Sequence, residues 1–357
     1  MVHISETKHP LACFMSYPFY PHEESEYGIG NYAYEILRNY RKMGFNPYTM
    51  TVGDLPHRMG QWPGKEIRFL HLLSSVQADV YHGVDAFSSK TAILLRKRPL
   101  IATVHDLVPR FFKTQIGRIS YVYNELSMKL ARKSDAVVVP FNITKEQVIS
   151  QYKIDREKIE VINYGVDHEL FRPKRMREDG KNRILYIGEL TRLKGVYTLL
   201  KAFRSILSSL KDAELIIGGK GEHRLQFERA AVTLGVDRSV RFTGFIPYRQ
   251  LPYYYRQATV FVWPSLLGFG LTPLQALACG TPVVAASALD MPEFLGDGGI
   301  LVQPEDHVNL AEAIQSILSD QDLRRSLSMR GLKRARKFSW ERTARETLML
   351  YEKLASQ

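Results

Sequence analysis

Cysteine is scarce in this chain, which has only Cys13 and Cys279 among 357 residues. A small secreted domain stabilised by disulfides would contain many more. Both fall in segments predicted to form regular structure, so we expect two buried thiols and a cytoplasmic protein. No run of about twenty apolar residues occurs, which excludes a transmembrane helix. Residues 1–10 lack the apolar core of a secretory signal, so none is predicted.

Motifs of several catalytic classes are also missing. No spacing of Cys and His predicts a zinc site, no Gly-Lys-Ser/Thr phosphate loop occurs, and no Gly-x-Ser-x-Gly turn offers a nucleophilic serine. Asp320-Gln321-Asp322 matches the Asp-x-Asp string that chelates a metal in some sugar transferases. It follows a predicted helix rather than a strand, so we expect a polar loop there and no metal site.

Positive charge is in excess, because 49 Lys and Arg against 37 Asp and Glu give a formal net charge of +12. This favours an anionic partner, but the sign alone does not choose among nucleic acid, an anionic membrane and phosphorylated small molecules. No nucleic-acid motif accompanies the basic clusters, so we expect no nucleic acid. The basic run 333–337 is most simply a solvated helix face. Residues 110–132 mix cations with aromatic and aliphatic side chains, which is compatible with peripheral contact with an anionic membrane.

Short apolar runs alternate with amphipathic ones through the first half of the chain, a pattern typical of a parallel sheet with helices. We predict strands at 12–17, 67–72, 78–81, 100–104, 136–139 and 159–162. We predict helices at 30–43, 90–96, 119–133 and 145–152. The expected fold class is α/β, built from doubly wound parallel sheets.

A polar segment between Pro173 and Asn182 interrupts this alternation and predicts a linker. The alternation then restarts, with strands predicted at 184–187, 214–217 and 240–243 and helices at 196–207, 225–234 and 250–257. We therefore expect two similar halves with a ligand-binding cleft between them: an N-terminal domain at 1–173, a linker at 174–182 and a C-terminal domain at 183–338.

Residues 259–284 form the most informative stretch and predict a strand, a glycine loop, a helix, a turn and a strand. Thr272 is a good N-cap and Pro273 suits the first helical position, so we expect a helix that starts at Pro273 and stops at Gly280. Gly268 and Gly270 precede it and would let a ligand approach the backbone. The amides at a helix start attract anions, so a phosphate-bearing ligand is one interpretation and an ordinary turn of an α/β sheet is the other.

Three further segments follow predicted strands, where ligands bind in open α/β sheets. Gly28-Ile29-Gly30 precedes a helix, although one Gly-x-Gly is weak evidence. His105-Asp106 places a histidine and a carboxylate at a strand end, as a functional pair or as a structural hydrogen bond. The loop 188–195 offers Arg192 and Lys194 to an anion.

Taken together these motifs resemble the family 4 retaining glycosyltransferases, which have the GT-B architecture of two Rossmann-like domains facing a cleft. The resemblance covers nearly the whole chain. It rests on segments whose order and spacing are specific: 28–32, 103–107, 161–167, 194–195, 242–247, 268–270 and 278–284.

The resemblance implies that the C-terminal domain binds a nucleotide diphosphate sugar and the N-terminal domain the acceptor, with residues 339–357 crossing back onto the N-terminal domain. Lys194 would neutralise the diphosphate and His105 would face the donor sugar, so these two are the implied catalytic residues. The implied donor-binding residues are Gly28, Gly30, Glu189, Arg192, Phe245, Ile246, Leu267, Gly268, Phe269, Gly270, Leu271, Thr272 and Gln275. No metal and no cofactor are expected, since Lys194 and helix amides stabilise the leaving diphosphate.

Three positions depart from the family pattern. Leu267 and Gln275 stand where the family has the two carboxylates of Glu-x7-Glu, and Glu189 stands where it commonly has an Arg. Gln275 can still hydrogen-bond ribose hydroxyls, whereas the Leu267 side chain cannot. Either the donor is held differently, with Arg192 or Glu293 supplying contacts, or the chain mainly binds without efficient transfer.

The sequence thus predicts retaining transfer of a hexose, of the mannose or glucose type, from a GDP- or UDP-linked donor to a hydroxyl of a glycan or lipid-linked acceptor. The alternative is a weak or inactive GT-B protein that binds glycans or assists a partner subunit. A localisation on the inner face of a membrane would fit either function.

Overall fold

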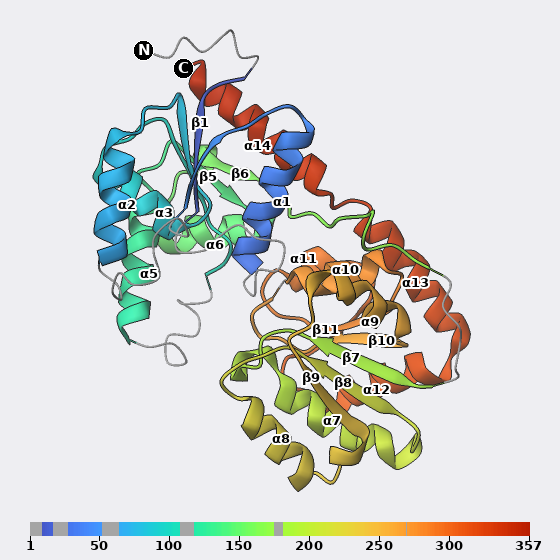
Figure 1. Cartoon of the computed structure of the whole chain (residues 1–357). Helices are drawn as coiled ribbons and strands as arrows, with labels where there is room; N and C mark the ends of the chain where they lie inside the picture. Colours follow the sequence, from blue (N-terminus) through green and yellow to red (C-terminus); the bar gives the residue numbers. More distant parts are fainter. Residues whose placement is uncertain (1–8, 17–27, 52–63, 108–117, 175–180, 269) are drawn as a thin grey trace. The chain divides into compact units, whose positions relative to one another are not determined.

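The computed structural model describes residues 9–16, 28–51, 64–107, 118–174, 181–268 and 270–357. The chain divides into two compact units: Met1–Gly165 with Trp340–Gln357 form the first, and Val166–Ser339 form the second (Figure 1). Most of the predicted linker at 174–182 lies outside the described residues. Each unit contains a six-stranded sheet whose strand pairs are all parallel.

The first unit has the strand order β2-β1-β3-β4-β5-β6. Its strands are β1 (Ala12–Ser16), β2 (Tyr48–Thr51), β3 (Val80–Gly83), β4 (Leu100–Thr103), β5 (Ala136–Val139) and β6 (Ile159–Val161). Its helices are α1 (Gly28–Lys42), α2 (Gly64–Ser75), α3 (Ala86–Leu94), α5 (Arg118–Ala131), α6 (Asn142–Tyr152) and α14 (Trp340–Ala355). The four central strands are buried along their whole length, as expected for a parallel sheet covered by helices on both faces.

One predicted strand of this unit is wrong. Residues 67–72 belong to helix α2, in which Phe69 and Leu73 are buried four positions apart while Ile67 is exposed. This spacing is helical, and the short apolar run concealed it. The missing sheet position is filled by β2, which lies at the edge beside β1 and pairs Met50 with Met15.

Helix α14 completes the first unit, although it comes last in the sequence. It packs against α1 (Figure 1), and the hydroxyl of Tyr351 is hydrogen-bonded to Nδ1 of His82 at 2.6 Å. His82 is fully buried, and its Nε2 is hydrogen-bonded to Oγ1 of Thr103 at 2.7 Å. Burial lowers the pKa of His82 to about 3, so the imidazole is neutral at physiological pH.

The second unit has the strand order β12-β11-β10-β7-β8-β9. Its strands are β7 (Arg183–Ile187), β8 (Glu214–Gly218), β9 (Val240–Gly244), β10 (Val260–Trp263), β11 (Val283–Ala286) and β12 (Ile300–Val302). Its helices are α7 (Val196–Ser209), α8 (Arg224–Thr233), α9 (Leu251–Gln257), α10 (Leu271–Ala278), α11 (Met291–Leu295), α12 (His307–Ser319) and α13 (Gln321–Ala335). This is the Rossmann order, in which the chain changes direction across the sheet between β7 and β10.

Each unit is thus a doubly wound parallel sheet, and the predicted fold class is confirmed. Cys13 and Cys279 are both buried and free, as expected. Asp320 does not lie in a plain polar loop: its carboxylate accepts hydrogen bonds from the amides of Asp322 and Leu323, both at 2.9 Å, and caps α13. Among the described residues, no helix combines the length and apolar character needed to cross a bilayer.

Candidate functional site

The loop that follows β7 holds the first group of predicted donor residues. It turns through a 3-10 helix, η2 (Arg192–Lys194), into Gly195, whose φ of +72° favours glycine. A Cβ at Gly195 would lie 2.0 Å from the carbonyl oxygen of Pro264. The amide of Leu266 also donates to the carbonyl of Leu193 at 2.8 Å. The loops after β7 and β10 are therefore fixed to each other at the point where the sheet order reverses, which is where open α/β sheets bind ligands.

The loop between β10 and α10 is held by an indole ring. The Nε1–H of Trp263 donates to the carbonyl of Gly268 at 2.7 Å in a buried hydrogen bond. Gly268 has a φ of +68°, and a Cβ there would lie 2.3 Å from Oδ1 of Asp290. A Cβ at Gly270 would lie 2.8 Å from the Trp263 ring. Both glycines are thus required by close packing, and Phe269 between them lies outside the described residues.

Helix α10 begins earlier than predicted. Its N-cap is Gly270 and its first residue is Leu271, so the prediction that Thr272 caps the helix and Pro273 opens it is wrong. Gly270 takes the cap position because its extended backbone fits against the Trp263 ring. Within the described residues no side chain caps the first amides, and the buried Oγ1 of Thr272 has no hydrogen-bond partner. Such uncapped amides, together with the helix dipole, favour an anion at this end.

Two cations lie in the loop that faces this helix start across the switch point. The half-buried Lys194 places its Nζ 4.9 Å from the centroid of the Trp263 ring, and this cation–π contact holds the ammonium beside the loop after β10. Arg192 is exposed and lines a cavity of about 370 Å³ together with Gly195 and Leu266. The other walls of this cavity come from α7, α8 and Glu305, so it adjoins the loop of Lys194 but does not include the start of α10.

The loops after β8 and β9 continue the same edge of the sheet. Gly219 approaches the loop after β7 so closely that a Cβ would lie 1.9 Å from the carbonyl oxygen of Gly188. The Nζ of Lys220 lies 5.0 Å from the centroid of the half-buried Phe245 ring, and Ile246 is buried. The predicted donor-binding residues Phe245 and Ile246 therefore stand on a loop that is connected to the neighbouring loops through backbone contacts, since the amide of Gly219 also donates to the carbonyl of Gly244 at 2.7 Å.

The three positions that depart from the family pattern also lie in this unit. Glu189 is exposed, and its carbonyl accepts a hydrogen bond from the hydroxyl of Tyr186 at 3.0 Å. Gln275 is only 5% exposed, and its Oε1 accepts a hydrogen bond from Tyr255 at 3.0 Å. Leu267 is half-buried. The Gln275 oxygen is therefore already engaged, and its amide nitrogen is the group with no hydrogen-bond partner among the described residues.

In the first unit, His105 follows β4 and both of its ring nitrogens are engaged. Nε2 lies 2.6 Å from the carbonyl oxygen of Val84, so Nε2–H is the donor. Nδ1 therefore accepts from the hydroxyl of Tyr164 at 2.7 Å. The Tyr164 ring stacks on the imidazole at 5.8 Å, and the Tyr32 ring meets it edge-on at 4.9 Å. Burial lowers the pKa of His105 to about 4, so the ring is a fixed neutral tautomer.

The other predicted residues of the first unit lie at the start of α1. Gly28 is its exposed first residue, with no described atom within 4 Å of where a Cβ would be, and the buried Gly30 lies in the same turn. Asp85, which the sequence did not single out, caps α3 by accepting from the amide and hydroxyl of Ser88. Burial raises the pKa of Asp85 to about 7, and its Oδ2 has no partner among the described residues.

The structure places the described members of the predicted set in the second unit on neighbouring loops and in α10. It adds Trp263, whose indole donates to the glycine loop, and Asp290, which lies close to Gly268. A signal for Trp263 is present in the sequence, since a large aromatic residue ends the strand immediately before the glycine loop. Asp290 gives no such signal, because its contact with Gly268 is tertiary. Over the described residues, no group of three or more His, Cys, Asp or Glu side chains is arranged to hold a metal ion.

Two family profiles match the chain. The profile described as "Glycosyl transferases group 1" matches residues 167–334. The profile described as "Glycosyltransferase Family 4" matches residues 27–170.

Two relatives and two solved structures illustrate the similarity. A D-inositol 3-phosphate glycosyltransferase of Corynebacterium urealyticum is 31% identical over 336 residues, which are 86% of this chain and 79% of that protein. An MMP alpha-(1->4)-mannosyltransferase of Mycolicibacterium hassiacum is 31% identical over 71% of this chain and 65% of that protein. Sucrose-phosphate synthase from Thermosynechococcus elongatus superposes with a TM-score of 0.79 at 21% identity, covering 97% of this chain and 99% of that one. Anabaena Alr3699/HepE in complex with UDP-glucose superposes with a TM-score of 0.77 at 18% identity, covering 98% of this chain and all of that one.

Proposed function

The chain belongs to glycosyltransferase family 4, the glycosyl transferases of group 1, and we propose that it moves a mannose- or glucose-type hexose from a nucleotide diphosphate sugar to a hydroxyl. The acceptor is a glycan or a lipid-linked saccharide, and the configuration at the transferred carbon is retained. The observation that carries this proposal is the uncapped start of α10, fixed through Gly195 and Pro264 to the loop of Lys194.

The donor diphosphate is proposed to bind at the switch point of the second unit. The amides of Gly270 and Leu271 cradle the phosphates, and Oγ1 of Thr272 gains the hydrogen-bond partner that it lacks within the described residues. Lys194 neutralises their charge, and Phe245 with Ile246 contacts the base. A structure with this fold holds UDP-glucose, and a relative is named as a mannosyltransferase, so UDP- and GDP-linked sugars are the donors to test first.

The proposed catalytic role of these residues is to stabilise the leaving diphosphate. When the bond from the sugar to the diphosphate breaks, negative charge grows on the phosphate oxygen. Preorganised amides and an ammonium in a partly dry site stabilise that charge without reorganising, which is how such donors lower a barrier. We propose that this replaces a metal ion here, and that the departing phosphate oxygen takes the proton of the acceptor hydroxyl.

The first unit is proposed to contribute His105 and the start of α1. Because both nitrogens of His105 are engaged and its ring is neutral, the role we propose for it does not include transfer of a proton. Gly28, with no described atom within 4 Å of its Cβ position, is proposed to let a ligand approach the start of α1.

One observation favours a second candidate function. Gln275 has its oxygen committed to Tyr255 and Leu267 offers no polar atom, so two donor contacts of the family are weakened. Each lost charged hydrogen bond costs about 1.5–3 kcal/mol, and two uncompensated losses would leave a protein that binds glycans or assists a partner subunit with little transfer.

A panel of sugar nucleotides tests the proposal without knowledge of the acceptor. UDP-glucose, UDP-N-acetylglucosamine and GDP-mannose are each incubated with the protein, and slow release of the nucleoside diphosphate is measured. We expect hydrolysis of at least one donor, and a loss of that hydrolysis in Lys194→Ala. Tight binding of a nucleotide without any hydrolysis would favour the second function, and neither binding nor hydrolysis would refute both.

Peripheral contact with an anionic membrane is a separate part of the proposal. The predicted segment 110–132 is described only from Arg118 onward, within α5. There the exposed Val122 and Leu126 share a helix face with the basic Arg118 and Lys129, a mixture that suits an anionic interface. The wild type should sediment with anionic vesicles at low salt, whereas a Val122→Glu/Leu126→Glu variant should not. Failure of the wild type to sediment would refute the proposed membrane contact.

A further inference from the structure

A second cavity opens in the second unit at the opposite edge of its sheet, away from the proposed donor loops. It has a volume of about 460 Å³ and lies at the amino-terminal ends of β7, β8 and β9. Its charged and aromatic walls are Lys181, Arg183, Glu214, Arg238, Arg241, Tyr253 and Tyr254. Strand β8 has five residues, so at a rise of about 3.3 Å per residue the two sites are roughly 16 Å apart.

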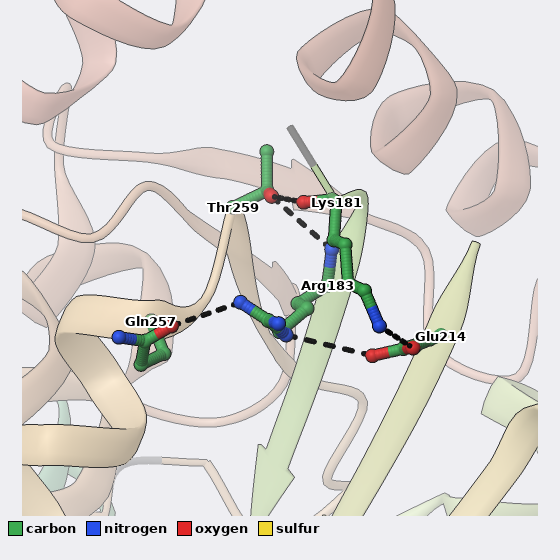
Figure 2. Close-up of polar contacts among 5 residues, drawn as sticks. All are labelled: Lys181, Arg183, Glu214, Gln257 and Thr259. Atoms are coloured by element: carbon green, nitrogen blue, oxygen red, sulfur yellow. Dashed lines mark hydrogen bonds and ion pairs between the residues drawn. The ribbon is translucent and has the colours of Figure 1, made fainter. Parts of the chain in front are cut away.

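Part of this cavity wall is a preformed network of polar contacts (Figure 2). The largely buried Arg183 donates to Oε1 of Gln257 at 2.8 Å and lies 3.4 Å from Oε2 of Glu214. The ammonium of Lys181 lies 2.9 Å from the other oxygen of the same carboxylate. Thr259 joins the backbones, accepting from the amide of Arg183 at 3.2 Å and donating to the carbonyl of Lys181 at 3.3 Å. The positions of these two cations are therefore set before any ligand arrives.

The carboxylate in this network does not neutralise the cavity. Hydrogen bonding by Lys181 is the main cause that lowers the pKa of Glu214, so Glu214 is ionised and shared by two cations. Arg238 and Arg241, on the far wall, are exposed and have no hydrogen-bond or ion-pair partner among the described residues. Four cations against one carboxylate leave a strong positive excess, and two guanidinium groups retain the fork of donors that matches an oxyanion.

The aromatic side of the cavity indicates which chemical group is attached to the anionic group of the ligand. Tyr253 projects from α9 with 59% exposure, and Tyr254 meets it edge-on at 5.7 Å. An exposed tyrosine offers an apolar face and a hydroxyl at one place, which suits a ring that is apolar on its faces and polar around its rim. A pyranose has this character, whereas inorganic phosphate has no group to place there.

We propose that this cavity is a second ligand site, separate from the donor site, and that it binds a saccharide bearing a phosphate or carboxylate group. The anionic group is held between Arg238 and Arg241, and the sugar ring lies on Tyr253. This proposal does not depend on the assignment of the donor site, because it uses no residue of the loops after the carboxyl ends of the strands.

The test uses the full chain and four probes: glucose 6-phosphate, glucuronate, glucose and inorganic phosphate. Hydrogen exchange locates any binding, and calorimetry measures affinity. We expect glucose 6-phosphate or glucuronate to protect residues 237–241 and 251–257, with glucose and inorganic phosphate at least tenfold weaker. The two charged sugars separate a phosphate source from a carboxylate source.

Two variants and one matched control complete the experiment. Arg238→Glu/Arg241→Glu should lose the protection and the affinity, whereas Arg204→Glu, an exposed arginine on α7 outside the cavity, should retain both. Tyr253→Ala should weaken binding of the charged sugar and leave inorganic phosphate unchanged. Nucleotide binding at the donor loops should be unchanged in all three, so failure of the donor assignment would be recognised separately.

Several results would overturn the inference. Equal affinity of the charged sugar for the wild type and the double variant would show that Arg238 and Arg241 do not bind the anionic group. Protection confined to 188–195 and 264–272 would show that the probe occupies the donor site alone. Inorganic phosphate binding as tightly as glucose 6-phosphate would refute the saccharide assignment, and no binding of any probe would refute the site.

Discussion

Substitution of Gly195 by alanine tests whether the contact between the loops after β7 and β10 builds the donor site. Gly195 has a φ of +72°, and a left-handed conformation costs an alanine about 1–2 kcal/mol. The added Cβ would also lie 2.0 Å from the carbonyl oxygen of Pro264 and 2.7 Å from its carbon. A relaxed contact between carbon and oxygen is about 3.3 Å, so one loop must move by roughly 1.3 Å.

The chain offers a matched control in the same unit. Gly235 has a φ of +68°, and no atom of the described residues lies within 4 Å of the Cβ that an alanine would add there. Gly235→Ala therefore carries the backbone cost without the collision. We expect Gly235→Ala to lower the free energy of unfolding by about 1–2 kcal/mol, and Gly195→Ala to lower it by about 1–3 kcal/mol more because overpacking is added.

The two variants should differ more in ligand affinity than in stability. Displacement of the Lys194 loop by about 1 Å weakens the contact of the ammonium with the diphosphate, and complete loss of a charged contact costs about 1.5–3 kcal/mol, or about 10- to 150-fold in affinity. Denaturant unfolding gives the stabilities and calorimetry with a nucleoside diphosphate gives the affinities. Gly235→Ala should bind like the wild type, and Gly195→Ala at least tenfold more weakly. The reasoning is refuted if Gly195→Ala matches Gly235→Ala in both measurements.

Three further outcomes follow from the same contacts. The pKa of His82 is about 3 in the folded protein, so below about pH 6.5 the unfolded chain binds a proton that the native chain does not, and the free energy of unfolding decreases as the pH is lowered. Relative to His82→Gln, the wild type should lose about 2 kcal/mol between pH 7 and pH 5 in urea titrations. Parallel pH profiles of the two proteins would exclude the effect. Tyr255→Phe removes the donor to Gln275 and should cost about 1–3 kcal/mol, whereas an unchanged melting temperature would mean that the buried amide finds another partner. Asp320→Ala should cost about 1 kcal/mol through loss of the α13 cap while Asp320→Asn retains most of it, and equal effects of both in thermal unfolding would argue against capping.

The sheets were predictable because their strands are short apolar runs between amphipathic segments. Residues 67–72 were ambiguous because their apolar side chains are interrupted by Arg68 and His71. Burial shows that Phe69 and Leu73 share a helical face. Strand β2 escaped prediction because it has only four residues, Tyr48–Thr51, which is too short for an alternating pattern to stand out, although Tyr and Thr both favour strands.

The candidate site was predictable as a set of loops but not as a set of contacts. Glycines at strand ends marked the loops after β7 and β10, because close approach needs residues without a side chain. The reasons for individual glycines came only from tertiary structure: Pro264 for Gly195, and Asp290 for Gly268. The N-cap was misplaced for the same reason, since the Trp263 ring makes Gly270 the end of the extended loop.

The central claim is that Lys194 and the start of α10 form a diphosphate site in the second unit. Calorimetric titration of the wild type and Lys194→Ala with UDP and with GDP tests it most directly. We expect the wild type to bind at least one of them with 1:1 stoichiometry. Loss of a charged contact worth about 1.5–3 kcal/mol should weaken that binding by about 10- to 150-fold in Lys194→Ala. Absence of binding to either nucleotide, or equal affinity in the two proteins, would contradict the claim.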